Sequence, residues 1–142
     1  MRLAVEHGDA LVATEPDADL VGRYAEAGGT GETWGQIPVC WNADAEKGLE
    51  LAHQQFRWSA LGWKVQAELP NPVNFDAAAR TVRPEDLAGS IPTGPDLEPY
   101  VEAARAWTDA GFTRIAFLQV GPDQDGFFSF WDRELRDALA GS

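Results

Sequence analysis

The chain has 142 residues, which is long enough for one domain with a buried core and too short for two domains of ordinary size. It carries 23 acidic and 11 basic residues, a net charge of −12. Such a surface repels phosphate backbones and anionic lipids, so we expect neither nucleic acid nor a membrane as partner. The single Cys40 excludes an internal disulfide and a cysteine-based zinc cluster, and we expect no metal. No apolar stretch of signal-peptide or membrane-spanning length is present, so the predicted location is cytoplasmic.

Short apolar runs alternate with amphipathic stretches along the chain, which is typical of strands alternating with helices in an α/β protein. The apolar runs are not strictly alternating, as expected of parallel strands buried on both faces. The predicted elements, in chain order, are a helical stub at 2–7, a strand at 10–13, a helix from 18 to 27, a strand at 36–40, a helix at 45–56, a short helix at 75–82, a strand before residue 93, a helix at 97–110, a strand at 114–119 and a helix at 124–139.

A similar junction follows each predicted strand and ends in an aspartate, namely Asp17, Asp44, Asp96 and Asp123. Carboxylates at these places satisfy free N–H groups in the first turn of the next helix. The first two aspartates and the last two are each 27 residues apart, whereas the middle pair is separated by 52. The chain is therefore predicted to contain four βα units with an insertion, residues 59–89, after the second. Pro38 makes the second strand the least certain, because proline removes a ladder donor.

Four βα units fit two architectures: an open, doubly wound sheet, or the second half of a (β/α)8 barrel, whose complete form takes about 250 residues. Periodicity does not separate the two. An independent flavodoxin-like domain is a third interpretation, although no phosphate-binding Gly-rich loop follows the first strand.

Four blocks of sequence resemble the carboxyl-terminal part of luciferase-like oxidoreductases that depend on the deazaflavin coenzyme F420. The blocks are GDALVATEPD (8–17), AELPNPVNFDAA (67–78), TGPDLEPYVEAA (93–104) and DAGFTRIAFLQVGPDQDGFFSFWDREL (109–135). The resemblance runs from residue 3 to residue 139, and the most similar branch is grouped with F420-dependent glucose-6-phosphate dehydrogenases.

The resemblance implies a single partial barrel domain over residues 1–142, with residues 59–89 as a lid-like insertion. It also implies hydride transfer between the deazaflavin and a small organic substrate, with FMN as the alternative cofactor. The strand at 10–13 would be the fifth strand of the barrel, so the chain would begin in the middle of the fold. The family's catalytic residues lie on earlier strands, and no residue of this chain matches them.

The resemblance assigns Thr14 and Glu15 to the loop that faces the cofactor's phosphate-bearing tail. Sugar-phosphate dehydrogenases of the family have a phosphate-binding lysine in this loop, where this chain carries Asp17. A second phosphate-binding residue of the family, an arginine, aligns near Ala88 or Gly89 of this chain. Lys64 is the candidate for the third. The absence of the lysine and the arginine argues against glucose 6-phosphate as the substrate.

Further candidates come from the strand ends, where barrel enzymes bind ligands. Trp41 follows a strand, and Trp58, Trp63 and Lys64 begin the insertion, so we predict a substrate pocket from these four residues, with core packing as the alternative. The turn Thr93-Gly94 is a possible anion-binding site, with ordinary helix capping as the alternative.

Cys40 and His53 are residue types that often act in catalysis, but a structural interpretation is simpler for both. Cys40 is expected to be an inert core thiol. His53 follows Ala52 on a mostly polar helix face and is expected to face solvent.

Half a barrel would expose two sheet edges and an apolar inner face. We therefore expect a homodimer, or a complex with a complementary first-half polypeptide. Two functional hypotheses follow: an oxidoreductase segment that is incomplete for catalysis by itself, or a non-catalytic half-barrel module or remnant of a truncated gene.

Overall fold

The computed structural model describes residues 1–141, which divide into two compact units. The sheet unit comprises Met1–Pro38, Leu97–Leu118 and the segment from Trp131 onward. The helical unit comprises Val39–Asp96 and Gln119–Phe130.

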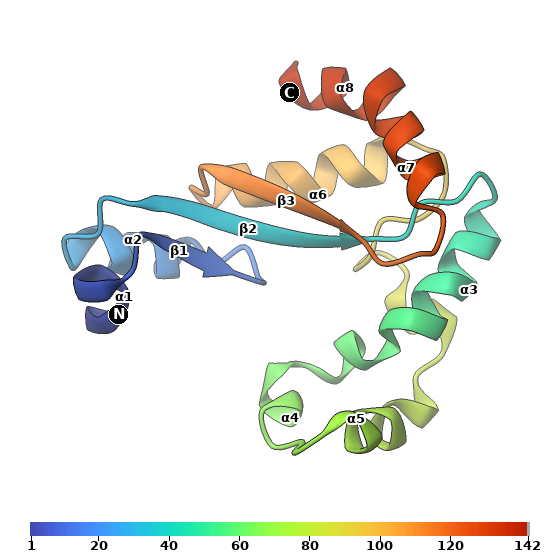
Figure 1. Cartoon of the computed structure of the whole chain (residues 1–142), viewed down its shortest axis with the longest axis horizontal. Helices are drawn as coiled ribbons and strands as arrows, with labels where there is room; N and C mark the ends of the chain where they lie inside the picture. Colours follow the sequence, from blue (N-terminus) through green and yellow to red (C-terminus); the bar gives the residue numbers. More distant parts are fainter. Residues whose placement is uncertain (142) are drawn as a thin grey trace. The chain divides into compact units, whose positions relative to one another are not determined.

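The sheet unit is built on three strands in the order β1-β2-β3 (Figure 1). Their bounds are Ala10–Ala13 for β1, Glu32–Val39 for β2 and Arg114–Gln119 for β3. Strand β1 pairs with β2 in parallel, and Val12 lies opposite Trp34. The last residues of β2 and β3 belong to the helical unit. The parallel sheet confirms the α/β class predicted from the sequence.

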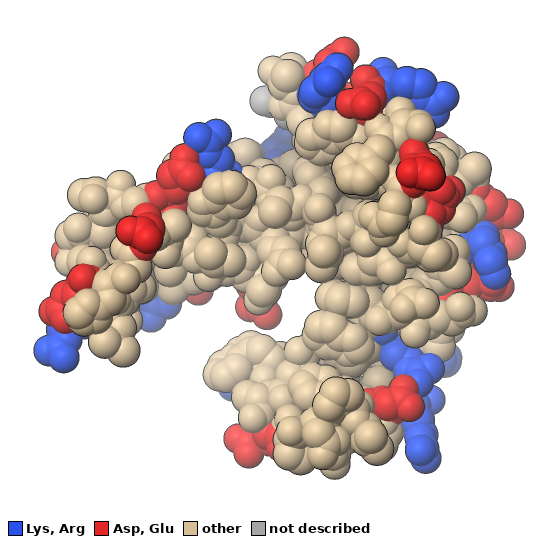
Figure 2. Space-filling model, viewed as in Figure 1, with Lys and Arg blue, Asp and Glu red and all other residues tan. Residues whose placement is uncertain are grey.

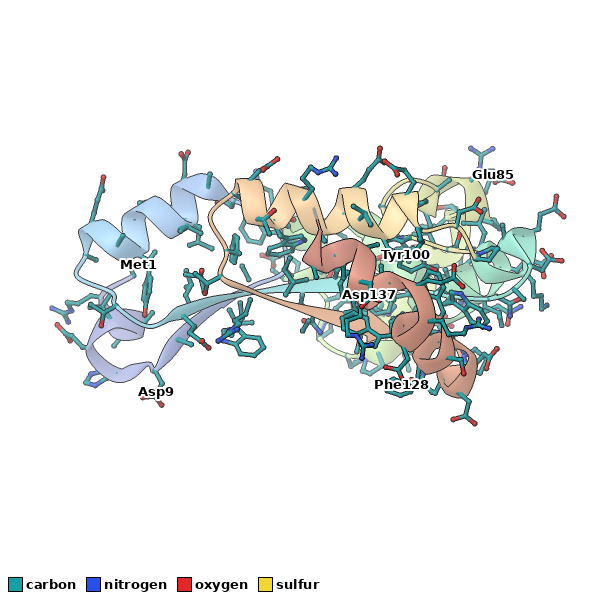
Figure 3. All side chains as sticks on the ribbon, turned by 90° about the horizontal axis from the view of Figure 1, so that it is seen from above. Met1, Asp9, Glu85, Tyr100, Phe128 and Asp137 are labelled. Atoms are coloured by element: carbon teal, nitrogen blue, oxygen red, sulfur yellow. The ribbon has the colours of Figure 1, made fainter. Side chains whose placement is uncertain are left out.

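Helices α2 (Ala18–Glu26) and α6 (Glu98–Asp109) cover one face of this sheet (Figure 3). The sheet unit also contains α1 (Arg2–His7) and α8 (Arg136–Ala140), and a π-helical turn, Trp131–Leu135, precedes α8. In Figure 3, α2 and α6 lie along one side of the strands. The contact is close, because a Cβ added at Gly35 would lie 2.2 Å from Cε3 of Trp107. Only glycine at this position of β2 lets the indole ring of α6 reach the strand.

The opposite face of the sheet is open and apolar. Val12 is 66% exposed, Trp34 37% and Leu118 40%, and the three come from three different strands. In Figure 2 the surface over the middle of the strands is free of charged atoms. Burial alternates along β2, so the expectation that the strands are buried on both faces is wrong for this chain. An apolar face of this kind is typical of a surface that other protein covers.

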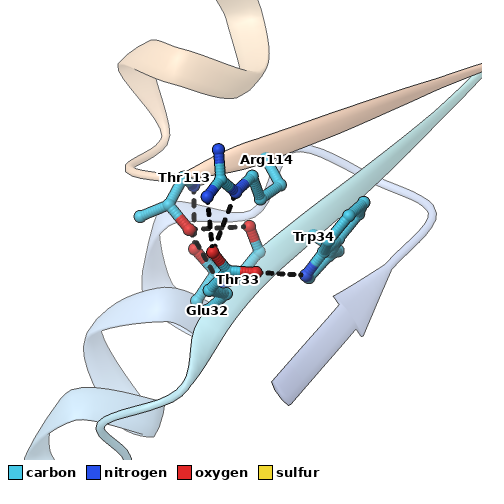
Figure 4. A network of polar contacts seen from close by, with 5 residues as sticks. All are labelled: Glu32, Thr33, Trp34, Thr113 and Arg114. Carbon is cyan, nitrogen blue, oxygen red and sulfur yellow. Dashed lines mark hydrogen bonds and ion pairs between the residues drawn. The ribbon is translucent and has the colours of Figure 1, made fainter.

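Polar side chains join β2 and β3 at their amino-terminal ends (Figure 4). The backbone N–H of Thr113 donates to the carbonyl and the hydroxyl of Thr33, both at 3.0 Å, and the N–H of Thr33 donates to Oγ1 of Thr113 at 3.0 Å. Arg114 donates to Glu32 at 2.8 Å, and this hydrogen bond lowers the pKa of the Glu32 carboxyl. The indole of Trp34 donates to the same carboxylate at 3.2 Å. Because ligands bind at the opposite ends of barrel strands, this network serves stability.

The helical unit contains no strand of its own among the described residues. Its helices are α3 (Ala45–Phe56), α4 (Trp63–Gln66), α5 (Pro72–Ala78) and α7 (Gln124–Phe130), with 3₁₀ turns at Arg57–Leu61, Ala79–Thr81 and Pro84–Leu87. One cluster of its buried core consists of Cys40, Ala52, Leu87 and Ile91. The helix predicted at 75–82 lies instead at Pro72–Ala78, because Asn71 caps it and Pro72 occupies its first position.

The junction aspartates act as expected at three of the four places. Asp17 accepts from the N–H of Leu20 at 3.1 Å, Asp44 from that of Lys47 at 3.1 Å, and Asp123 from the N–H of Gly126 at 2.9 Å. The fourth, Asp96, does not cap a helix, because α6 begins at Glu98 after Leu97.

The number of strands differs from the prediction. The described residues hold three strands, and the fourth expected one is reduced to a single parallel bridge between Cys40 and Thr93. The N–H of Cys40 donates to the carbonyl of Pro92 at 2.9 Å, and Pro92 has no N–H with which to extend the pairing. The single domain over 1–142 and the insertion bounds 59–89 stay predictions.

Candidate functional site

The carboxyl-terminal ends of β2 and β3 are joined through the side-chain amide of Gln119. Its Oε1 accepts from the N–H of Trp41 at 2.8 Å, and its Nε2 donates to the carbonyl of Trp41 at 3.2 Å. Gln124 holds the other side of the turn, because its Nε2 donates to the carbonyls of Gln119 at 3.1 Å and Gly121 at 2.7 Å. The backbone of Trp41 is thus fixed on both its donor and its acceptor, which restricts where the indole can lie.

The indole of Trp41 is buried at this strand end. It is 9% exposed and stacks on Phe130 with 5.9 Å between ring centroids. A Cβ at Gly126 would lie 2.2 Å from the indole, so α7 approaches this ring only through a glycine. Nε1 of Trp41 is buried and has no hydrogen-bond partner among the described residues. A buried donor without an acceptor is costly, so this N–H is suited to a partner that the chain itself does not supply.

The turn Thr93-Gly94 packs against the start of α3. Gly94 has a φ of 81° and is buried, and a Cβ there would lie 2.8 Å from Cβ of Ala45. Helix α6 begins only at Glu98, so the turn does not lead directly into the next helix of the chain. This packing supports a structural role for Thr93 and Gly94 over the predicted anion site.

Thr14 and Glu15 lie in the exposed loop after β1, within the sheet unit. The loop and the following turn carry the acidic residues Glu15, Asp17 and Asp19, and the one nearby cation, Arg23, lies 3.9 Å from Asp17. A phosphate-bearing cofactor tail needs cations or free N–H donors, whereas Asp17 already occupies the N–H of Leu20. The loop as it stands does not fit the tail of F420.

A cavity of about 530 Å³ lies in the helical unit, in the segment of residues 54–79. Trp58 and Phe75 form part of its wall, together with Leu69 and Gln66. Of the four residues predicted to form a substrate pocket, Trp58 alone lines this cavity. Trp63 is 63% exposed on α4, and Lys64 beside it is exposed as well.

Helix α3 separates Trp41 from Trp58. Trp41 precedes the amino-terminal end of this helix, and Trp58 follows its carboxyl-terminal end. Its 12 residues span about 18 Å at 1.5 Å per residue. Of the predicted set, Trp41 thus lies at the strand end and Trp58 at the cavity, while Trp63 and Lys64 belong to neither.

Cys40 and His53 have structural surroundings. Cys40 is fully buried, and burial raises the pKa of its thiol to about 11, which confirms the inert core thiol. His53 is half-buried, and its Nε2 lies 2.8 Å from the carbonyl of Val82, so the expectation that it faces solvent is wrong. The ring connects α3 to the segment before the Pro84–Leu87 turn.

Gln119 and Gln124 are the site residues that sequence reasoning missed. Their sequence signal is weak, because a glutamine at the end of a strand is common on ordinary surfaces. Both glutamines belong to the segment QVGPDQ (119–124), which is part of the last block that carries the family resemblance.

The fold resembles that of an F420-dependent enzyme. A solved structure named F420-dependent secondary alcohol dehydrogenase, in complex with an F420-acetone adduct, matches with a TM-score of 0.74 at 16% identity. The match covers 97% of this chain and 45% of that one. The architecture is accordingly that of part of a barrel, as the resemblance implied.

The sequence is also similar to that of curated proteins, although no protein-family model matches it. The F420-dependent glucose-6-phosphate dehydrogenase of Segniliparus rotundus is 29% identical over 131 residues, which are 91% of this chain and 37% of that protein. The enzyme of the same name from Rhodococcus erythropolis is 27% identical over 106 residues, covering 73% of this chain and 31% of the relative. The chain is therefore similar in sequence to proteins named F420-dependent glucose-6-phosphate dehydrogenase, and it spans about a third of the length of the curated proteins it matches.

Residues 1–141 contain neither a candidate metal site nor a helix suited to cross a membrane. No group of three or more His, Cys, Asp or Glu side chains converges as a metal site in residues 1–141. In the same part of the chain, no helix combines the length and the apolar character needed to cross a membrane.

Proposed function

We propose that this chain supplies the carboxyl-terminal part of an F420-dependent oxidoreductase of the (β/α)8 type, which transfers a hydride between the deazaflavin and a small organic molecule. The open apolar face of the sheet, with Val12, Trp34 and Leu118, carries the proposal. In a closed barrel this face is the interior, filled by side chains from the remaining strands. The sequence relatives and the fold match support the same assignment.

The three strands then form a consecutive part of the barrel wall. Neighbouring barrel strands follow one another along the chain, and the order β1-β2-β3 has this property. The carboxyl-terminal ends of β2 and β3, with Trp41 and Gln119, would line the mouth where such enzymes bind ligands. Trp41 is our leading candidate for contact with the substrate, through its unpartnered indole N–H.

The cofactor would be held mainly by other polypeptide. The loop with Thr14 and Glu15 is acidic and does not fit the phosphate-bearing tail. The remaining barrel strands would come from a complementary first-half polypeptide, or from a second copy of this chain if the alternative, a non-catalytic half-barrel, is correct. FMN stays the alternative cofactor.

The proposal is tested with a chimaera that joins the amino-terminal part of the Segniliparus rotundus relative to this chain. We expect the chimaera to bind F420 and to reduce it with a small alcohol, followed as loss of deazaflavin absorbance. Glucose 6-phosphate should be a poor substrate, because Asp17 stands where the phosphate-binding lysine of the family lies.

The matched variants of the chimaera are Trp41→Phe and Trp63→Phe. We expect the first to lower turnover and the second, at an exposed position, to leave it unchanged. A chimaera that is folded by circular dichroism and binds neither F420 nor FMN would refute the proposed function.

A further inference from the structure

We propose that the cavity within residues 54–79 is a second small-molecule site, and that it accepts an uncharged compound with a flat aromatic part and a hydrogen-bonding carbonyl or amide. The site lies past the carboxyl-terminal end of α3, whereas the strand-end site with Trp41 lies at its amino-terminal end. It is formed by this chain's own helical unit and does not depend on the barrel assignment.

The aromatic wall of the cavity is fixed before any ligand binds. The indole of Trp58 packs on Phe56 with ring centroids 4.3 Å apart, and Phe75 meets it edge-on at 6.0 Å and 90°. These rings touch each other, and their remaining surface gives the cavity an aromatic wall on which a planar, apolar group can pack. The volume, about 530 Å³, falls in the range that holds small organic ligands.

The polar groups of the lining are mostly side-chain amides. Gln54 and Gln55 present exposed amides at the end of α3. Nε2 of Gln66 makes only long contacts, 3.4 Å to the carbonyl of Trp58 and 3.5 Å to that of Ser59. Such contacts are weak, so this amide can turn to a ligand carbonyl at little cost. Amides that both donate and accept suit a neutral amide or carbonyl group.

The charged groups of the lining neutralise each other. Arg57 and Asp76 both line the cavity and form an ion pair. Lys64, the other cation of this region, does not line it. A phosphorylated or carboxylated ligand would lose its hydration without gaining a free cation, which disfavours it. The ligand class therefore differs from the sugar phosphate in the relatives' name.

The test uses two probes with the same ring system, 2-naphthamide and 2-naphthyl phosphate. Each is titrated into the 142-residue chain by calorimetry and followed by the NMR signal of the Trp58 indole N–H. We expect 2-naphthamide to bind with a Kd of about 1 mM or tighter, and the phosphate at least about tenfold more weakly. The indole signal of Trp58 should move with the amide, while that of Trp34 should stay in place.

Two variants of α3 with the same new side chain locate the site. Gln54→Trp places a large ring at the rim of the cavity, and Glu50→Trp places it at an exposed position that does not line it. We expect Gln54→Trp to weaken 2-naphthamide binding about tenfold or more, and Glu50→Trp to leave it unchanged. Phe75→Leu, which removes the edge-on ring, should weaken it as well.

Three results would overturn the proposal. They are absence of 2-naphthamide binding, equal affinity for the amide and the phosphate, and equal binding by the Gln54→Trp and Glu50→Trp variants. Failure of the chimaera to bind F420 or FMN would refute the proposed oxidoreductase function, and it would not bear on these three results.

Discussion

Replacement of Gly35 by alanine should unfold the sheet unit more readily. The new methyl carbon would lie 2.2 Å from Cε3 of Trp107, well inside contact distance. The indole has little room to move, because it is 4% exposed and packs edge-on against Phe112 at 4.7 Å. Overpacking of this kind costs about 1–3 kcal/mol. With a urea m-value of about 1–3 kcal/mol/M, the midpoint of unfolding should fall by about 1 M.

The matched control is Gly22→Ala, in the exposed part of α2. Nothing lies within 4 Å of a Cβ at this position, and alanine in a helix is favoured over glycine by about 0.5–1 kcal/mol. Equilibrium urea unfolding, followed by circular dichroism, should therefore move the two midpoints in opposite directions. An unchanged midpoint for Gly35→Ala would show that α6 does not pack on β2 as described.

Four further outcomes are expected. Trp34→Glu places a charge on the open sheet face. Light scattering should therefore show less self-association, or less pairing with a first-half polypeptide, than for the wild-type chain. Equal association would show that this face is not the interface. Because burial raises the Cys40 pKa to about 11, iodoacetamide at pH 8 should label this thiol only after urea is added, and labelling of the native chain would contradict its burial. The Arg114 hydrogen bond lowers the pKa of Glu32, so the pair stabilises the fold above the ordinary carboxyl pKa and loses this contribution as the pH falls through the lowered pKa. Glu32→Gln should flatten the dependence of the unfolding free energy on pH in this acidic range. An unchanged dependence would refute a stabilising role of the pair. Asp44→Ala removes the cap of α3 and should cost about 1 kcal/mol by urea unfolding, whereas no loss would mean that water replaces the cap.

Local rules predicted the helices well. The capping aspartates Asp17, Asp44 and Asp123 are signals that depend on a few neighbouring residues, and all three cap as expected. The buried thiol of Cys40 followed from its place in an apolar run. The α/β class followed from the alternation of apolar runs with amphipathic stretches.

Strand pairing was harder to predict, because it depends on which segments meet. Pro38 was expected to weaken its strand, yet it lies within β2, the longest strand of the described chain. The carbonyls of Thr33 and Val39 bond toward β3, so Pro38 faces the other side, and β1 reaches only as far as Gly35. The N–H that Pro38 lacks is therefore not needed for strand pairing. The run before Thr93 has strand-like composition but forms only one bridge.

The candidate site was predicted in part. Trp41 lies at a strand end as expected, whereas its connection to Gln119 required the register of two strands that are 78 residues apart in sequence at this contact. The separation of Trp58 from Trp41 follows from the length of α3, and the sequence clustering of the tryptophans concealed it. The cavity beside Trp58 depends on how the segment of residues 57–79 folds back on α3, which periodicity does not reveal.

The central claim is that this chain is one part of an F420-dependent barrel and does not hold the cofactor alone. Titration of F420, followed by its fluorescence quenching, tests this directly with the purified chain alone and after mixing with the amino-terminal part of the Segniliparus rotundus relative. We predict no saturable quenching by the chain alone and saturable quenching by the mixture. Tight, stoichiometric binding of F420 by the 142-residue chain alone would contradict the account.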